Sequence, residues 1–451
     1  MNESSSPLVG FRLSVMMFLQ FFVWGAWYVT TGPYMKEHGL ESVIYWAYTV
    51  GPIAAILSPF FLGMVADRFF SSERVLAAMQ ILGGVFIALA PMAARHKWEW
   101  VDADGAFAFL REGPFIGMLL LHMLCYMPTL GLTNTVAFHA MTAPEKQFPL
   151  VRVWGTIGWI VAGLTVSKLG VDKADRVFAG FGDMPLGQYQ LAGAAAILLG
   201  LYSLTLPHTP PPAKGKPFSV RDALGLDALA LLKRTDFAVF IAASLLVCIP
   251  LAAYYAFAGT FVGAQGVEGV GSVMSRGQMS EIFFMLVMPF FFVRLGVKWM
   301  LAVGMLAWVV RYALFTWAAG MPQAEWTGAL AWLVGDPKLT MPIFLGILLH
   351  GICYDFFFVT GFIYTERVAP KALRASAQGF LVLITQGVGM LLGAQISGMI
   401  FNRVTTDGST DWRTFWLVPA VMALAILLLF VAAFRERPAA SSASEAGTSG
   451  G

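Results

Sequence analysis

The apolar residues of this chain are gathered into long runs separated by short polar connections. There are about twelve such runs, each near the roughly 20 residues that an α-helix needs to cross a bilayer. They lie near 11–33, 43–66, 73–93, 113–138, 148–168, 188–206, 237–262, 274–294, 298–320, 341–364, 374–401 and 413–434. This pattern predicts an all-α membrane protein with about twelve transmembrane helices.

The composition agrees with that prediction and excludes several other classes. Only 12% of the residues are charged, against about 25% in soluble domains. The net charge of +3 and the lack of a basic run speak against a nucleic-acid partner. Three cysteines, Cys125, Cys248 and Cys353, have no CxxC spacing, so neither a disulfide framework nor a metal site is inferred.

One connection is longer and more basic than the others. It covers 207–236, begins with Pro207 and separates six apolar runs from six. We therefore expect an N-terminal segment (1–10), a six-helix lobe (11–206), a linker (207–236), a second six-helix lobe (237–434) and a disordered tail (435–451). Lys and Arg residues are more numerous in the loops on the side of the membrane that carries the linker than on the other side. This excess predicts that both termini and the linker lie in the cytoplasm.

Two groups of six helices joined by a cytoplasmic linker are the plan of a secondary transporter with two lobes, which works by alternating access. A channel is disfavoured because no filter-like loop or ring of charge occurs. An enzyme is disfavoured because no HExxH, GxSxG or Walker loop occurs. No cofactor is expected, and an ion gradient would drive the cycle.

The connection after the second apolar run carries a recognisable motif. It reads Gly63-Met-Val-Ala-Asp67-Arg68, with Arg74 six residues further on. The motif resembles the signature loop of the major facilitator superfamily. Gly63 would permit close helix approach, and Asp67, Arg68 and Arg74 would form a charge latch between the lobes at the cytoplasmic face.

A closer resemblance extends over the whole chain. The stretches that carry it are FLQFFVWGAWYVTTGPYM (18–35), YMPTLGLTNT (126–135), RVWGTIGW (152–159), GLDALALLK (225–233), AWVVRYALF (307–315), DFFFVTG (355–361) and RASAQGF (374–380). They are similar to the bacterial nucleoside:proton symporter family. The resemblance implies a monomer in the bacterial inner membrane that couples inward proton flow to nucleoside uptake.

The same resemblance implies a central substrate site formed by the fifth, seventh, eighth and tenth helices. Its expected members are Arg152, Thr156, Trp159, Tyr255, Gln278, Glu281, His350, Tyr354 and Asp355. Some positions depart from the family pattern: His350 stands where a tyrosine is usual, and Tyr354 where a phenylalanine is usual. Ala252 and Tyr255 replace a glutamine and an asparagine, so the family's substrate does not follow automatically.

Four charged residues lie away from the ends of the apolar runs: Arg152, Glu281, Arg311 and Asp355. Charges at bilayer depth are costly and usually mark a substrate or proton path, although mutual pairing could also neutralise these four. Asp355 and Glu281 are the proton-coupling candidates, with Asp355 favoured because Glu281 could instead bind the ligand. Arg152 offers a planar fork of donors, or alternatively snorkels to the interface. Arg311 is expected to be structural.

The aromatic residues divide into two expected groups. Most members of the first group are expected to pack or to face lipid or its interface; they are Trp24, Trp27, Tyr28, Phe356 and Phe357. Members of the second group could stack on a planar base or a sugar face; they are Trp159, Tyr254, Tyr255 and Tyr354. The GxxxG spacing of Gly389 and Gly393 predicts close helix packing.

Two alternatives to nucleoside uptake stay open. The same fold could carry a sugar, a glycoside or another polar solute, which a substrate panel would reveal. A protein that binds its ligand without moving it could act as a sensor, which binding without uptake would reveal. The two intramembrane carboxylates speak against the sensor, because a pure binder needs no titrating pair at that depth.

Overall fold

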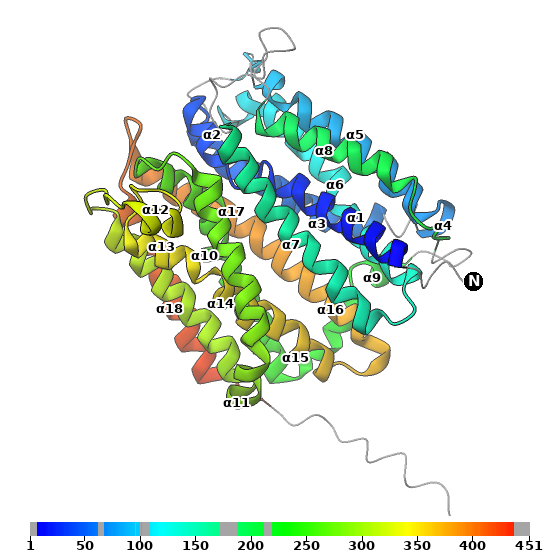
Figure 1. The fold of residues 1–451 in the computed structure, drawn as a ribbon. Coiled ribbons are helices and arrows are strands. Elements are labelled where there is room, and N and C mark those ends of the chain that lie inside the picture. The colour runs from blue at the N-terminus through cyan, green and yellow to red at the C-terminus, as the bar shows by residue number, and fades with distance from the viewer. Residues whose placement is uncertain are drawn as a thin grey trace, which may run out of the picture.

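The computed structural model describes residues 7–61, 67–94, 96–99, 101, 108–170, 187–211 and 219–436. The helices form one bundle (Figure 1). Its first half contains α1 (Pro7–Gly25), α2 (Thr31–Glu37), η2 (Glu41–Val43), α3 (Ile44–Phe61), α4 (Asp67–Phe69), α5 (Ser72–Ala93), η4 (Ala108–Glu112), α6 (Gly113–Ala140), α7 (Pro144–Leu169) and α8 (Gln188–Ser203).

Two short elements, α9 (Val220–Ala223) and η5 (Leu226–Lys233), lie in the linker. The second half contains α10 (Thr235–Ala264), α11 (Val270–Ala318), α12 (Gly328–Val334), α13 (Met341–Leu348), α14 (His350–Tyr354), the π-helix η6 (Asp355–Val359), α15 (Thr360–Val368), η7 (Lys371–Leu373), α16 (Arg374–Val382), the π-helix η8 (Leu383–Gly389), α17 (Met390–Val404), the paired strands β1 (Thr405–Thr406) and β2 (Ser409–Thr410), and α18 (Trp412–Ala433).

The helices account for the predicted apolar runs. Among the described residues, 10 helices are long and apolar enough to cross a membrane. One of them, α11, is two helices joined at Gly296, whose φ of 66° and ψ of 179° are not helical. Dividing α11 there and adding the 16-residue α8 gives twelve, as the sequence predicts.

The first run is the clearest difference from the predicted boundaries. The expected 11–33 is not one helix, because α1 ends at Gly25 and α2 begins at Thr31. The Tyr48 hydroxyl satisfies backbone groups at this break: it donates to the Tyr28 carbonyl (2.8 Å) and accepts from the Gly32 N–H (3.2 Å). Hydropathy does not reveal such a break, because the residues on both sides of it are apolar.

Each half packs mainly on itself. In the first half α5 lies against α6 and α8, and α1 lies against α7; in the second half α11 contacts α13, α14 and α18, and α10 contacts α17. The halves meet where α7 lies against α11 and α3 against α17. In Figure 1, α7 and α17 accordingly run near the middle of the bundle. The exact domain limits of the sequence analysis stay a prediction.

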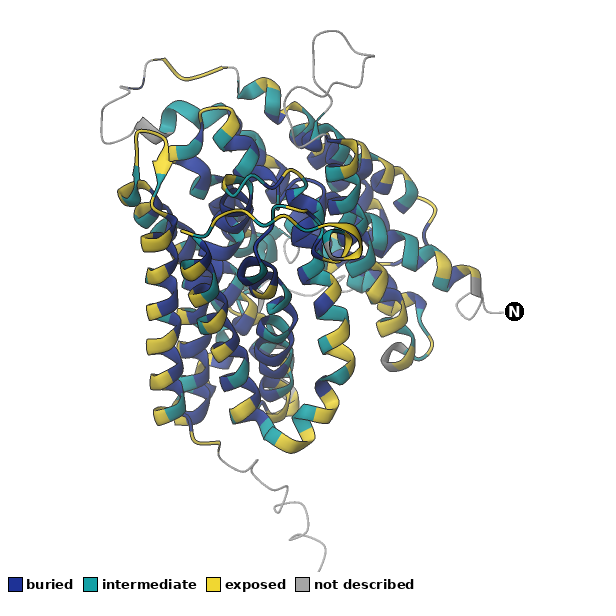
Figure 2. Cartoon of the chain, turned by 60° about the vertical axis from the view of Figure 1, so that its left-hand side comes forward, coloured by how far each residue is buried: buried dark blue, intermediate teal, exposed yellow. Residues whose placement is uncertain are grey.

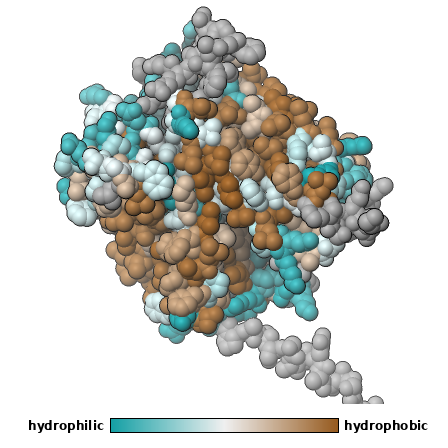
Figure 3. Space-filling model, in the orientation of Figure 1, coloured by the Kyte–Doolittle hydropathy of each residue, from teal (hydrophilic) through white to brown (hydrophobic). Residues whose placement is uncertain are grey.

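The outside of the bundle is apolar, as a bilayer requires. Exposed residues follow the outward edges of the helices in Figure 2, and many of them are apolar, including Leu286, Val293 and Leu429. Figure 3 shows apolar side chains over much of one face, with polar residues toward its margins.

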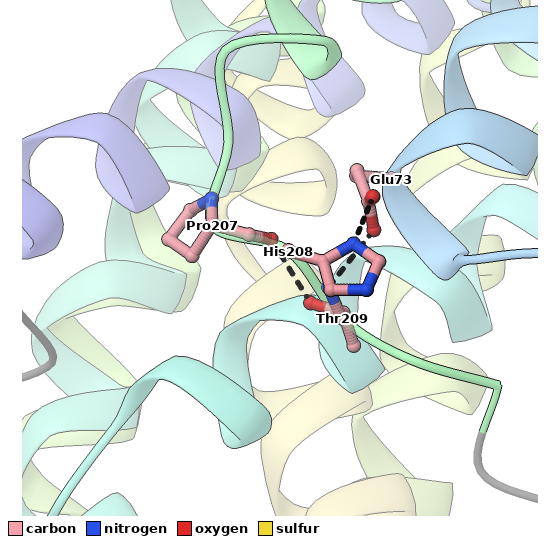
Figure 4. A network of polar contacts seen from close by, with 4 residues as sticks. All are labelled: Glu73, Pro207, His208 and Thr209. Atoms are coloured by element: carbon pink, nitrogen blue, oxygen red, sulfur yellow. Dashed lines mark hydrogen bonds and ion pairs between the residues drawn. The ribbon is translucent and has the colours of Figure 1, made fainter.

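The linker is anchored at both of its described ends. At its start, Glu73 of α5 accepts hydrogen bonds from the His208 ring (2.9 Å) and from the Thr209 N–H (3.0 Å) (Figure 4). The Ser72 N–H also donates to the Thr209 carbonyl (2.9 Å). Near its end, Gly225 has a φ of 64° and packs so closely on α16 that a Cβ there would lie 2.9 Å from the Phe380 nitrogen. The start of the linker is therefore fixed to the first half, and its end is fixed to the second half.

Contacts between the halves lie toward the end of the bundle opposite the linker. A Cβ on Gly271 of α11 would lie 2.9 Å from the carbonyl of Gly163 in α7, so the two backbones nearly touch. Beside them the Ser272 N–H donates to the Ser167 hydroxyl (2.8 Å). Two further hydrogen bonds join α17 and η2 or α3, from Gln395 to Thr49 and from Asn402 to Ser42. Small and polar residues thus close this end.

Candidate functional site

A cavity lies between the two halves of the bundle. It contains about 730 Å³ of empty space, including the part that opens to solvent. Both halves contribute to its wall, from α1, α7, α10, α11, α14, η8 and α17. The residues that line it are Phe21, Trp24, Tyr28, Arg152, Thr156, Trp159, Tyr255, Gln278, Glu281, His350, Tyr354, Gln386 and Met390.

The first half supplies aromatic rings through the close packing of α1 on α7. A Cβ on Gly25 would lie 3.0 Å from the Trp159 backbone, so the glycine allows the two helices to approach. The rings of Trp24 and Trp159 then meet edge to face, with centroids 5.5 Å apart. Tyr28 continues this surface to Tyr255 of the second half, at 5.9 Å. Edge-to-face pairs of this kind hold the rings in fixed orientations.

Arg152 supplies the positive charge of the first-half wall. One turn later on α7, Thr156 lines the same cavity. The guanidinium lies over the Phe21 ring at 4.1 Å, and no hydrogen bond or ion pair to it is found among the described residues. It is close enough to Glu281 for the two charges to interact electrostatically. Its donors therefore remain available to a ligand.

Glu281 and His350 stand together on the second-half wall because two glycines let their helices approach. A Cβ added to Gly277 of α11 would lie 3.2 Å from the His350 Cβ. On α14, the Gly351 N–H donates to the Ser280 hydroxyl of α11 (3.1 Å). His350 Nε2 consequently lies 3.7 Å from Glu281 Oε2. One turn before Glu281, Gln278 adds an amide whose oxygen is buried without a protein partner among the described residues.

Behind His350 lies a buried column of rings that ends in Arg311. The His350 ring stacks on Tyr254, with centroids 5.7 Å apart and planes at 20°. The Arg311 guanidinium lies over the Tyr254 ring, 4.1 Å from its centroid, and the Arg311 Nε–H donates to the Gly346 carbonyl (2.9 Å). Arg311 is fully buried and does not line the cavity. The expected structural role of Arg311 agrees with these contacts.

Asp355 is placed differently from the other predicted substrate contacts. It follows the cavity-lining Tyr354 directly and begins the π-helix η6. Its side chain is 0% exposed, and neither carboxyl oxygen has a hydrogen-bond partner among the described residues. It does not line the cavity, so in this conformation it does not reach a ligand there. It is close enough to Glu281 for electrostatic interaction.

The structure thus brings eight of the nine predicted contacts to one cavity, leaving out Asp355. It also adds five residues that sequence analysis did not select: Phe21, Trp24, Tyr28, Gln386 and Met390. Trp24 and Tyr28 thus line the cavity although they belong to the group whose members were mostly expected to pack or face lipid. An apolar run gives no signal for which of its aromatic faces meets a cavity. Gln386 did carry a signal, as an amide inside an apolar run.

The predicted latch is described only in part. Gly63 lies outside the described residues, and the side chain of Asp67 is not described. Arg68 is partly buried in the short helix α4, and Arg74 is exposed on α5. The latch stays a prediction.

The chemistry of the cavity suits a planar polar solute. Aromatic rings offer faces for stacking, while Gln278 and Gln386 offer amides that donate and accept. Arg152 and Glu281 add one charge of each sign from different halves. A solute bound between them contacts both halves at once, as alternating access requires.

Known proteins match the chain along nearly its whole length. Residues 8–439 fit a family model described as "Nucleoside H+ symporter". The "Putative nucleoside transporter YegT" of Escherichia coli (strain K12) is 38% identical over 435 residues, which covers 94% of this chain and 93% of that protein. The "Nucleoside permease NupG" of the same organism is 31% identical over 446 residues, with coverages of 94% and 96%.

Solved structures agree with these relatives. A crystal structure of the nucleoside transporter NupG superposes with a TM-score of 0.76 at 30% identity, and covers 95% of this chain and 100% of that one. The likeness confirms the predicted fold, that of the major facilitator superfamily with about twelve transmembrane helices.

Proposed function

This chain belongs to the nucleoside H⁺ symporter family, and on that premise we propose that it takes up nucleosides by proton-coupled symport. It is a multi-pass protein of the bacterial inner membrane. The observation that supports nucleoside uptake most directly is the mixed wall of the cavity. Arg152, Trp159 and Glu281 line the same space from two different halves, so one bound solute contacts both.

Each group on this wall has a natural partner on a nucleoside. The aromatic surface of Trp24 and Trp159 fits the face of a base. The Glu281 carboxylate accepts hydrogen bonds from ribose hydroxyls, and the Arg152 guanidinium donates to hydroxyl or base oxygens. The roles of Thr156, Tyr255, Gln278, His350 and Tyr354 as further contacts belong to the same proposal.

Proton coupling is assigned to Asp355, with Glu281 as its partner. A charged Asp355 has no hydrogen-bond partner among the described residues and is fully buried, and such a charge costs several kcal/mol. Binding a proton removes that cost, so proton occupancy affects the energy of this packed conformation. Because Asp355 adjoins Tyr354 of the cavity wall, substrate and proton act on the same short segment. Their binding is then linked.

The described conformation fits one stage of alternating access. The halves touch at the end opposite the linker, through Gly163 and Gly271 and through Ser167 and Ser272. With the linker and both termini in the cytoplasm, this is the periplasmic end. The conformation is then closed to the periplasm. We assign the protein as a monomer that needs no cofactor and draws its energy from the proton gradient.

The test is uptake of radiolabelled uridine and adenosine by energised membrane vesicles that contain the protein, with and without a proton uncoupler. The expected result is accumulation that collapses when the uncoupler is added. Binding without accumulation would contradict the transport assignment. If a sugar but neither nucleoside accumulates, and the uncoupler abolishes that accumulation, the nucleoside assignment is wrong. The assignment of proton coupling would then still stand.

A further inference from the structure

The α16–η8–α17 segment carries three glutamines, and they are in different environments. Gln378 donates to the Phe362 carbonyl (2.9 Å), and Gln395 donates to the Thr49 hydroxyl (2.7 Å). Gln386 lies between them in η8 and lines the cavity. Among the described residues its amide has no hydrogen-bond partner. The two outer glutamines have structural bonds, and the middle one does not.

The position of Gln386 follows from how its helix packs on α10. A Cβ on Gly389 would lie 2.8 Å from the Cys248 Cβ, and a Cβ on Gly393 would lie 2.7 Å from the Ala252 Cβ. These contacts confirm the predicted close packing of the GxxxG pair. They leave no room for a longer side chain at Ala252, so this part of the α10 surface offers no amide to the cavity. The neighbouring helix supplies one instead.

The π-helical turn of η8 supports a functional reading of this position. Single π-turns inside α-helices are rare, and those that occur often lie at functional sites. One turn after Gln386, Met390 also lines the cavity. A thioether packs well on the face or edge of an aromatic ring, and an amide offers a donor and an acceptor side by side. Together they match the face and the edge of a planar heterocycle.

From this arrangement we propose that Gln386 is a substrate-contacting residue that hydrogen-bonds the edge of the nucleobase and so sets base preference. The inference rests on the proposed function, because it presumes a nucleoside in this cavity. Ribose hydroxyls rotate, whereas a base edge holds its donors and acceptors side by side in one plane, and a glutamine amide can pair with a donor and an acceptor there simultaneously. Glu281 and Arg152 remain for the sugar.

The experiment measures binding to the purified full-length protein, with uridine and 3-methyluridine as ligands. The methyl group of the second ligand replaces the N3–H donor of the base edge. In Gln386→Met, which keeps side-chain length but removes the amide, the Kd for uridine is expected to rise about tenfold. The Kd for 3-methyluridine is expected to change much less. Gln386→Leu, which also removes the amide, serves if the methionine variant does not fold.

Gln378→Met is the matched control, since it removes an amide from the same helical segment outside the cavity. It should leave the Kd of both ligands unchanged. An unchanged uridine Kd in both Gln386 variants would overturn the inference, and so would an equal loss for both ligands. If the wild-type protein binds no nucleoside, the proposed function itself is wrong. Failure of the Gln386 inference and failure of the proposed function therefore give different results.

Discussion

The two halves of the bundle build the cavity wall in different ways. The first half presents aromatic rings and one cation, Arg152, on helices held together by glycine contacts such as Gly25 against Trp159. The second half presents a carboxylate, an imidazole and two amides beside the rings of Tyr255 and Tyr354, and keeps Asp355 sealed directly behind its surface. The comparison suggests a division of labour, in which the first half holds the solute and the second half also handles the proton.

Replacing Asp355 tests this division most severely. Asp355→Asn nearly keeps the shape but cannot exchange a proton, so proton-driven accumulation is expected to fall by at least about tenfold while nucleoside binding survives. Accumulation and exchange would be compared in vesicles. Glu366→Gln on α15 is the control, because Glu366 is an exposed carboxylate paired with Arg374. Full accumulation in Asp355→Asn would remove this residue from the coupling role.

Separating the halves should have the next largest effect. Gly163→Leu places a bulky side chain against Gly271, and such overpacking costs about 1–3 kcal/mol, which changes the ratio of closed to open states by roughly 5- to 150-fold. Transport should fall while the protein still folds. Accessibility of the cavity to a thiol reagent from the periplasmic side, measured through an engineered cysteine, should rise. Unchanged accessibility would show that this contact does not set the closed state.

A milder change tests the cation of the first half. Arg152→Lys keeps the charge but loses the planar fork of donors, so the Kd for nucleoside is expected to rise about tenfold with folding intact. Isothermal titration of the purified protein measures it. An unchanged affinity would show that the Arg152 guanidinium extends to the membrane interface and does not bind the ligand.

The smallest effect is expected from Arg311, the buried arginine of the second half. Arg311 lies over Tyr254 at 4.1 Å behind the wall, and two of its guanidinium nitrogens are buried without a hydrogen-bond partner among the described residues. Replacing it by an apolar residue of similar length removes the cost of burying that charge. Arg311→Met should therefore keep uptake within about twofold of wild type. Arg152→Met, its counterpart in the first half, should lose most uptake. Equal loss in both variants would show that the Tyr254–His350 column is part of the transport machinery.

Sequence reasoning predicted the helices well because the bilayer imposes one length and one kind of side chain on each. It missed the break after Gly25, because the Tyr48 hydroxyl that satisfies this break comes from another helix. It identified Glu281 and Arg152, since charges inside apolar runs stand out. It could not foresee that Asp355 is sealed while Gln386 is open to the cavity. Both outcomes depend on how neighbouring helices pack.

The anchoring of the linker has a consequence for how the halves are joined. Thr209 is fixed to α5 and Gly225 to α16, so only about fifteen residues connect the two anchor points, with a reach of at most roughly 50 Å. A connection of this length keeps the halves at a high effective concentration. The two halves, cut between these anchors and produced as separate chains, would therefore retain every contact through which they move against each other.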